Sequence, residues 1–504
     1  MNTQTLFRAI AAFIICAGML PAMSQAYDLK ITELQSPGSP LISFRIILRR
    51  GAINDPKGKE GLNALTAQVI AQGGTKDLTY SQVVDKMYPW AAGIGAQTDY
   101  EVTTFIGNIH KDHLTDFYKL FTALLLQPRF DSSDFSRVKD DALNYLKNEL
   151  RSNDDEALGK EGLSAFVFRN HPYSTTEIGT VQGITSITLD DVKKYYQENY
   201  TQATLWIGVA GGYPSELIDW FKKDFGTLPA GDFTPVPLTA PEPIKDVEVQ
   251  VIEKPTGAYA VSMGYPINIT RSDKDFYALL LANSYFGEHR TFSGVLMNHL
   301  REYRGLNYGD YSYIERFVGG LESPFPDLNT PLRQQYFSIW LRPVQPENTH
   351  FAIRDAMYEL NQLVTKGISN EDFEKTRKFL TNYSKLWAAT MNRRLGYLMD
   401  SQFYGTDYYI DRIAKELSTL TADDVNAVVK KYLHPSDIKI AVVVDEGKGK
   451  DFLNALIANT PSPITYQSTP AQAILDEDKI IQVFPLKINT EKSMVVKSSE
   501  LFEK

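Results

Sequence analysis

Apolar residues recur along the chain with two different periods, which together predict a protein of mixed helices and strands. Short apolar runs that are typical of strands occupy residues 41–48, 102–109, 205–210, 336–341 and 438–444. Two other segments have the spacing of amphipathic helices, with Leu114, Phe117, Tyr118, Phe121 and Leu125 in one and Ile353, Met357, Leu360 and Val364 in the other. Because strands and helices do not alternate regularly, the pattern predicts an α+β fold.

Two landmarks recur in the second part of the chain at nearly the same offset. Thr188 and Thr421 each precede a predicted helix and are followed three residues later by an aspartate, as in a capping box. These two threonines lie 233 residues apart. Asp134 and Asp372, near the start of two further predicted helices, lie 238 residues apart. Landmarks at such similar offsets predict a duplicated domain.

Prolines mark the junction between the two copies. Five of them fall within residues 229–243, and proline stiffens and extends such a segment. The predicted organisation is an N-terminal domain at residues 27–228, a linker at 229–246, a C-terminal domain at 247–461 and a tail at 462–504. Because helical periodicity ends after residue 461, the tail is expected to be extended and to pack on the surface.

Residues 1–26 have the pattern of a secretory signal peptide. Arg8 precedes an apolar run at residues 9–20, and Ser24-Gln25-Ala26 offers small residues at the −3 and −1 positions of a cleavage site. Cleavage near Ala26 would remove the chain's one cysteine, so the exported protein is expected to depend on its core and not on disulfides. The predicted location is the periplasm or the cell exterior. No later segment is apolar enough to predict a membrane span.

Composition and charge narrow the choice of partners. The 504-residue chain is 43% hydrophobic and 22% charged, as in an ordinary globular protein. With 52 Lys and Arg against 61 Asp and Glu, its formal net charge is −9. An acidic balance without a long basic run argues against a nucleic-acid partner.

The stretch GKEGLNALTAQVIAQGG at residues 58–74 carries the first indication of a family. Together with HPY at 171–173, GT at 179–180 and the segment 476–503, it resembles the pitrilysin or insulinase (M16) family of zinc metallopeptidases, especially short two-domain members similar to mitochondrial processing peptidase subunits. The resemblance covers nearly the whole mature chain. It implies two duplicated metallopeptidase-like (LuxS- and processing-peptidase-like) α/β sandwich domains that form one half of a clamshell.

The helix within this stretch lacks the residues that hold zinc in the family. The H-x-x-E-H motif places two histidines and a general-base glutamate on one helical face. In register, these positions are Ala64, Ala67 and Gln68, and Glu149 corresponds to the third ligand, a glutamate on a later helix. One carboxylate cannot hold a catalytic Zn²⁺, which takes three protein ligands. The chain is therefore expected to bind no cofactor and to hydrolyse no peptide by itself.

Other catalytic chemistries have little support in the sequence. His110 and His113 form a candidate metal pair, but they fall at a predicted strand-to-helix turn with no third ligand nearby, which favours a solvated turn. The sequence contains no G-x-S-x-G elbow, and GKGK at residues 447–450 lacks the spacing of a P-loop.

The second half has a different motif, LREYRGLNY at residues 300–308. A helix that stops at Gly305 and a strand from Leu306 would bring Arg301 and Tyr308 to one point. A structural interpretation pairs Arg301 with a neighbouring acid and places Tyr308 in a core. The family resemblance implies another role, in which an Arg and a Tyr with this spacing hold the substrate backbone opposite the zinc. Both side chains can donate hydrogen bonds to a carbonyl oxygen that gains negative charge.

In paired family members one chain carries zinc and the other carries the Arg/Tyr pair. The first hypothesis is therefore a non-catalytic, substrate-binding subunit of an exported heterodimeric zinc peptidase. A homologous partner would supply Zn²⁺, the substrates would be peptides or unfolded proteins, and residues 95–100 would correspond to the family's substrate-binding edge strand. The alternative is a peptide-binding or scaffold pseudoenzyme without a proteolytic role. An independent hydrolase with unfamiliar chemistry has no motif to support it.

Overall fold

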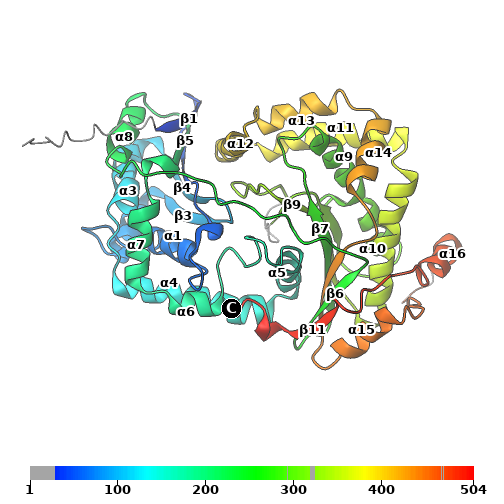
Figure 1. Ribbon diagram of the computed structural model, residues 1–504. Helices are drawn as coiled ribbons and strands as arrows, with labels where there is room; N and C mark the ends of the chain where they lie inside the picture. The colour runs from blue at the N-terminus through cyan, green and yellow to red at the C-terminus, as the bar shows by residue number, and fades with distance from the viewer. Residues whose placement is uncertain (1–28, 292, 318–323, 467, 469) are drawn as a thin grey trace, which may run out of the picture.

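A computed structural model describes residues 29–504 except 292, 318–323, 467 and 469. The predicted signal peptide at residues 1–26 lies outside the described residues. Two mixed sheets stand side by side, each with helices around it (Figure 1). The first part of the chain builds one sheet and the second part builds the other.

The first sheet has five strands in the order β1-β5-β2-β4-β3. Their bounds are β1 (Lys30–Gln35), β2 (Leu41–Leu48), β3 (Gly93–Thr98), β4 (Thr103–His110) and β5 (Leu205–Gly211). β1 is parallel to β5, and the other neighbours are antiparallel. Since β3 has a neighbour on one side, it is an edge strand of this sheet.

The second sheet has six strands in the order β11-β6-β10-β7-β9-β8. Their bounds are β6 (Glu248–Glu253), β7 (Tyr259–Ile267), β8 (Asp310–Tyr313), β9 (Gln335–Val344), β10 (Lys439–Val444) and β11 (Met494–Lys497). β6 is parallel to β10, and β10, β7, β9 and β8 follow one another antiparallel. Apart from β11, this order and these directions repeat those of the first sheet strand for strand. The predicted duplicated α+β fold is therefore confirmed.

Helices surround each sheet. In the first half they are α1 (Leu62–Ala71), α2 (Tyr80–Met87), α3 (Leu114–Leu126), α4 (Ser132–Asn144), α5 (Asp155–Val167), α6 (Val181–Ser186), α7 (Leu189–Asn199) and α8 (Glu216–Phe225). In the second half they are α9 (Asp275–Gly287), α10 (Pro346–Lys366), α11 (Asn370–Trp387), α12 (Met391–Tyr404), α13 (Tyr409–Leu417), α14 (Ala422–Tyr432), α15 (Gly449–Ile457) and α16 (Gln472–Ile481). The chain also has two π-helical segments, η4 (Tyr145–Asn153) and η6 (Met297–Glu302). Within the described residues, no helix combines the length and the apolar character needed to cross a bilayer.

The repeated landmarks are equivalent helix starts. The side chains of Thr188 and Thr421 cap α7 and α14, and the aspartate three residues later completes a capping box in both cases. Asp131 and Ser369 likewise cap α4 and α11 through their side-chain oxygens. Local capping chemistry therefore explains why the two halves begin their helices at matching places.

Each half contributes one helix to the sheet of the other. α5 packs against β7 and β10, while α12 packs against β1, β2 and β5 (Figure 1). Leu158 and Leu163 of α5 join a buried cluster with Val443 of β10, and Leu395 of α12 joins another with Ile47 of β2. These reciprocal apolar contacts hold the two halves against each other.

The proline-rich segment 229–246 contains no helix or strand and crosses between the halves (Figure 1). The expectation of a wholly extended tail is wrong, because α16 forms within it. The buried residues of α16 are Asp478 and Ile481. Beyond α16, β11 adds a parallel strand beside β6.

Candidate functional site

α1 forms where the sequence predicts it and is fixed at its N-terminus by Asp55. The Asp55 carboxylate accepts hydrogen bonds from the backbone N–H groups of Gly61 and Asn63, each at 2.7 Å. Gly61 has φ of +105°, and a Cβ there would lie 2.4 Å from the Ile178 carbonyl oxygen, so the position requires glycine. Most of the helix is buried, and it serves as packing for the first half.

The three positions of the lost zinc motif have different surroundings. Ala64 and Gln68 line a cavity of about 230 Å³, whereas Ala67 is fully buried in the core. The Gln68 amide donates a hydrogen bond to the carbonyl oxygen of Ala96 in β3 at 3.0 Å. Gln68 also accepts one from the Gln72 amide at 2.9 Å. Where the family places a zinc ligand, this chain has an amide that binds α1 to the edge strand.

Asp141 of α4 is the carboxylate that lines this cavity, and Glu149 is not among its lining residues. Glu149 lies exposed on η4, where it accepts a hydrogen bond from the Asn153 amide at 3.4 Å. The cavity thus presents one carboxylate and the amides of Gln68 and Gln72 among mostly apolar side chains. This donor set does not fit catalytic Zn²⁺, which takes three imidazole, thiolate or carboxylate ligands. No metal-assisted step can be assigned to α1.

Arg301 and Tyr308 lie beside each other in the second half, as the turn geometry predicts. The guanidinium carbon of Arg301 lies 5.0 Å from the centre of the Tyr308 ring. Arg301 belongs to the π-helix η6, a rare conformation that is frequent at functional sites. Gly305, with φ of +63°, makes the turn that follows. β8 begins at Asp310, so Tyr308 lies in the turn before the strand and not on the strand as predicted.

The structural interpretation of this pair holds for one residue and fails for the other. Arg301 does pair with a neighbouring acid, since it donates a hydrogen bond to Glu302 at 3.0 Å. Tyr308 does not fill a core, because it is 70% exposed. A large aromatic side chain held at the surface is accessible to a ligand.

A second arginine connects Tyr308 with the first half. The guanidinium carbon of Arg342, on β9, lies 5.3 Å from the centre of the Tyr308 ring. The same side chain donates a hydrogen bond to Glu156 of α5 at 2.8 Å. Arg342 and Glu156 both line a cavity of about 260 Å³ between α5 and the second sheet. The Arg301–Tyr308 pair therefore lies next to the residues that line this cavity.

The cavity is lined by charged and aromatic side chains from both halves. Its charged residues are Asp154, Glu156, Lys160, Glu161 and Glu177 from the first half and Arg290, Arg316 and Arg342 from the second. Burial, together with the charge of Glu177, raises the pKa of Glu161 to about 7. Burial lowers the pKa of His289 to about 3, and the charges of Arg290, Lys160 and Arg342 act in the same direction. His289 is therefore a neutral imidazole, and its Nδ1 lies 2.6 Å from the Tyr313 hydroxyl.

Arg316 is a functional candidate that sequence reasoning missed. It lies in the loop after β8 and donates a hydrogen bond to Glu177 at 3.0 Å. Its Nε lies 3.5 Å from the carboxylate of Asp99, just after β3. Both acids belong to the other half of the chain, so no local spacing could have connected them with Arg316. His289 and Arg290 also line the cavity.

His110 and His113 lie in a solvated turn, as the sequence predicts. His113 ends the short 3₁₀ turn after β4, and His110 Nδ1 lies 3.3 Å from the carboxylate of Asp112. The side chains of His110 and Asp112 are 40% and 68% exposed. This pair is a surface feature.

Comparison with known proteins shows which family this chain resembles. Residues 186–380 match the model of the family described as the Peptidase M16 inactive domain. The predicted resemblance to M16 peptidases is confirmed. Over 418 residues the chain is 22% identical to the "Non-peptidase homolog YmxG" of Helicobacter pylori, which covers 82% of this chain and 90% of that protein. It is also 25% identical to a probable mitochondrial-processing peptidase subunit beta of Arabidopsis thaliana, over 73% of this chain and 68% of the relative.

A solved structure agrees with the M16 fold. The chain superposes on a peptidase M16 inactive domain from Pseudomonas fluorescens with a TM-score of 0.73 and 20% identity, covering 83% of this chain and 96% of that one. At this identity the likeness shows the shared fold alone. The similarity to an M16 inactive domain and to a non-peptidase homologue agrees with the presence of Ala64, Ala67 and Gln68 at the motif positions of α1.

Proposed function

We propose that this M16 chain is the non-catalytic, substrate-binding subunit of an exported two-chain zinc peptidase. One observation carries the proposal: Arg301 and Tyr308 lie together and accessible in the second half, whereas α1 has no donor set for zinc. A homologous partner would supply Zn²⁺ and the general base. This chain would supply two hydrogen-bond donors to the substrate.

The proposed chemistry follows from the two side chains. Arg301 presents a planar guanidinium and Tyr308 a phenol, and both can donate to a peptide carbonyl oxygen as it becomes an oxyanion. Arg301 and Arg342 both approach the Tyr308 ring, which favours a defined ring position. The ion pair between Arg342 and Glu156 would keep this position fixed relative to α5.

Peptides and unfolded proteins are the proposed substrates, and strand addition at β3 would be restricted in this chain. β3 is an edge strand, the type of element that accepts an added peptide strand. The side-chain amide of Gln97 in β3 donates a hydrogen bond to the carbonyl oxygen of Leu328 in the second half at 2.7 Å. This contact covers part of the edge, so the main substrate strand would pair with the partner subunit.

The names of the relatives are compatible with both functional hypotheses. A mitochondrial-processing peptidase "subunit" is by name a part of a larger enzyme, which supports a paired assembly. "Non-peptidase homolog" supports a chain without its own proteolytic activity, and it also suits a scaffold.

The deciding experiment is co-expression with an M16 homologue from the same organism that retains H-x-x-E-H. We expect a stable one-to-one complex that cleaves flexible peptides, with each chain alone nearly inactive. Light scattering would measure the stoichiometry, and a quenched fluorescent peptide would measure turnover. Separate chains, or full activity from the zinc-bearing chain alone, would contradict the proposal. A complex that forms without any cleavage would favour the scaffold alternative.

Export is a separate part of the proposal with its own measurement. The protein should be recovered from the periplasmic or secreted fraction, and mass spectrometry should find its N-terminus near Tyr27. An intact N-terminus in the cytoplasmic fraction would contradict export and would leave the subunit proposal to be judged by the complex.

A further inference from the structure

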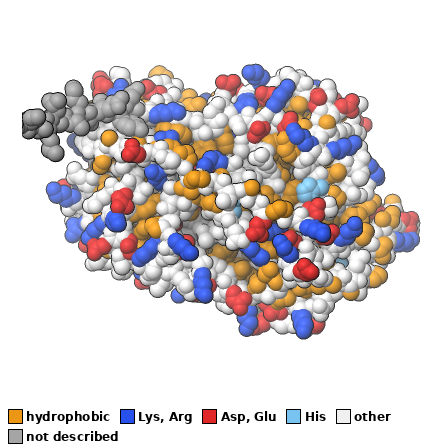
Figure 2. All heavy atoms as spheres, in the orientation of Figure 1, with side chains coloured by type: hydrophobic (Ala, Val, Ile, Leu, Met, Phe, Trp, Pro, Cys, Tyr) orange, Lys and Arg blue, Asp and Glu red, His pale blue; other side chains and the backbone are white. Residues whose placement is uncertain are grey.

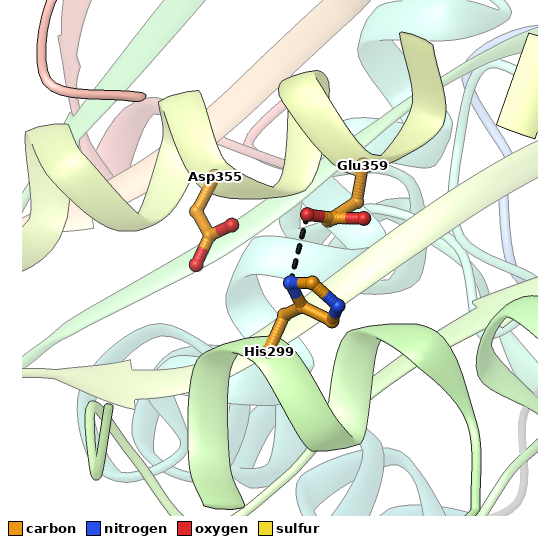
Figure 3. A group of neighbouring side chains, drawn as sticks. All are labelled: His299, Asp355 and Glu359. Carbon is orange, nitrogen blue, oxygen red and sulfur yellow. Dashed lines mark ion pairs between the residues drawn. The ribbon is translucent and has the colours of Figure 1, made fainter. Parts of the chain in front are cut away.

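Three side chains with metal-binding groups converge in the second half (Figure 3). The ligand atoms of His299, Asp355 and Glu359 all lie within 4.8 Å of one another. Asp355 and Glu359 are four residues apart on α10 and share one face of that helix. His299 faces them from η6. The three residues therefore come from two elements that pack against each other.

The two carboxylates are buried in an arrangement that hydrogen bonding does not explain. Asp355 is 0% and Glu359 is 4% exposed. Neither oxygen of Asp355 has a hydrogen-bond partner among the described residues, and an unsatisfied buried carboxylate is costly. His299 Nδ1 lies 2.8 Å from Glu359 Oε1, which is an ion-pair distance, but the angle of the contact is not that of a regular hydrogen bond. Ligands that each lie about 2.0–2.2 Å from one ion are roughly 3 Å apart, which is close to this separation.

The charges around the cluster do not balance. Glu477 and Asp478 of α16 lie beside the cluster, and His299 Nδ1 is 3.7 Å from Glu477. Arg304 is the facing guanidinium: it contacts Glu477 and Asp478 at 2.8 Å each and lies 3.6 Å from Asp355. Four carboxylates thus surround one arginine and one histidine. With His299 protonated and all four carboxylates ionised, the group would carry two more negative than positive charges.

We propose that His299, Asp355 and Glu359 bind one divalent metal ion, with Glu477 near enough to add a further oxygen. One imidazole nitrogen with carboxylate oxygens is a donor set that suits Zn²⁺, Mn²⁺ or Co²⁺. The site differs from the family's catalytic position. In the duplicated fold the counterpart of α1 is α9, the helix after β7, and α9 contains none of these three residues. The proposal departs from the expectation that the chain binds no metal.

The ion would have a structural role. Asp355 and Glu359 are closed off from solvent, while the His299 side chain is 24% exposed and provides the route of entry. Bound metal would join η6 to α10, and η6 also carries Arg301. Because a folded site binds metal and an unfolded chain does not hold this geometry, the ion should stabilise the fold. This inference does not depend on peptidase activity.

The test uses the full mature chain without an affinity tag, stripped of metal by chelator and titrated with Zn²⁺, Mn²⁺ and Co²⁺. We expect one saturable site per chain by calorimetry and a higher thermal midpoint with the bound ion. His299→Gln and Glu359→Gln each remove one ligand with little change in size and should weaken binding by at least about tenfold. The matched control, His113→Gln, changes a surface histidine and should bind as the unmodified chain does.

Two results would overturn the proposal: no saturable binding of any of these ions by the unmodified chain, or unchanged binding by folded His299→Gln and Glu359→Gln variants. The cluster would then be a buried ion pair between a protonated histidine and carboxylates. Should either variant fail to fold, X-ray absorption of the zinc-loaded unmodified chain decides. We expect one imidazole nitrogen together with oxygen ligands, and a site with a different ligand set would reject the assignment.

Discussion

The guanidinium carbon of Arg301 lies 5.0 Å from the centre of the Tyr308 ring, so a cation and a phenol share one accessible position in the second half. Arg342 approaches the same ring at 5.3 Å. Each such contact at an exposed site is worth about 0.5–1 kcal/mol. Since Tyr308 is 70% exposed, these arginines contribute more to its position than core packing does. The hydroxyl group can therefore be removed while the ring stays in place.

Tyr308→Phe tests the contribution of the Tyr308 hydroxyl separately from that of its ring. The variant keeps the ring contacts with Arg301 and Arg342 but loses the phenolic donor, so fold and assembly should persist. Loss of one donor to a developing oxyanion typically costs about 10²–10³ in turnover. The measurement is kcat of the complex with a flexible peptide. Tyr88→Phe is the control, because Tyr88 is 84% exposed in the first half and should tolerate the change without loss of turnover.

Arg301→Lys should also impair the complex. Lysine keeps the positive charge but loses the planar guanidinium, which can donate two directed hydrogen bonds to a substrate. We expect a fall in kcat/KM on the order of tenfold or more. Arg377→Lys is the matched control, because Arg377 pairs with Glu374 on α11 and is assigned no substrate contact. If Arg301→Lys and Tyr308→Phe both assemble and cleave at the unmodified rate, the Arg301–Tyr308 pair is ancestral and has no role in turnover.

At the positions of the lost zinc motif, a small polar substitution should leave turnover unchanged, whereas a large apolar substitution should lower the stability of the chain. Ala64 lines a cavity of about 230 Å³, so Ala64→Ser should leave turnover of the complex within a few-fold. Ala67 is fully buried, and Ala67→Leu should destabilise the chain by about 1–3 kcal/mol through overpacking. Urea unfolding checks the second result. A large loss of turnover in a stable Ala64→Ser complex would show that α1 has a chemical role.

Local signals predicted much of the fold. Thr188 and Thr421 could be recognised as equivalent because a capping box involves residues only three positions apart. Strand β2 coincides with its apolar run at residues 41–48. α16 was not predicted, and Ile481 is its one buried apolar residue.

Among the functional residues, too, the sequence could predict contacts only between residues that lie close together in the chain. Arg301 and Tyr308 could be placed together because one turn separates them, whereas Arg342 meets Glu156 only when the two halves are docked. Asp355 and Glu359 have helical spacing in the sequence, but their approach to His299 depends on how η6 packs against α10. Sequence patterns therefore predicted contacts within an element or turn, and tertiary packing decided the rest.

The contact between the halves should make stability depend on pH. Asp99 of the first half is 1% exposed and lies 3.5 Å from Arg316 of the second half. Burial raises the pKa of Asp99 from 3.8 to about 7, with Arg316 opposing the shift and Glu177 adding to it. Because the folded-state pKa exceeds the unfolded value, the folded state holds this proton more tightly. The resulting stabilisation is complete below about pH 4 and is lost as the pH rises through about 7.

Asp99→Asn should remove this part of the pH dependence. The asparagine oxygen can still accept the hydrogen bond from the Tyr100 backbone N–H, so the local turn should persist. Between pH 5 and pH 8, the free energy of unfolding should fall less in the variant than in the unmodified chain, by on the order of 1–3 kcal/mol. Urea unfolding at both pH values provides the measurement, with Asp77→Asn on the exposed surface as the control. If the variant and the unmodified chain lose equal stability over this range, Asp99 does not bind the proton, and another group is responsible for any pH dependence of the contact.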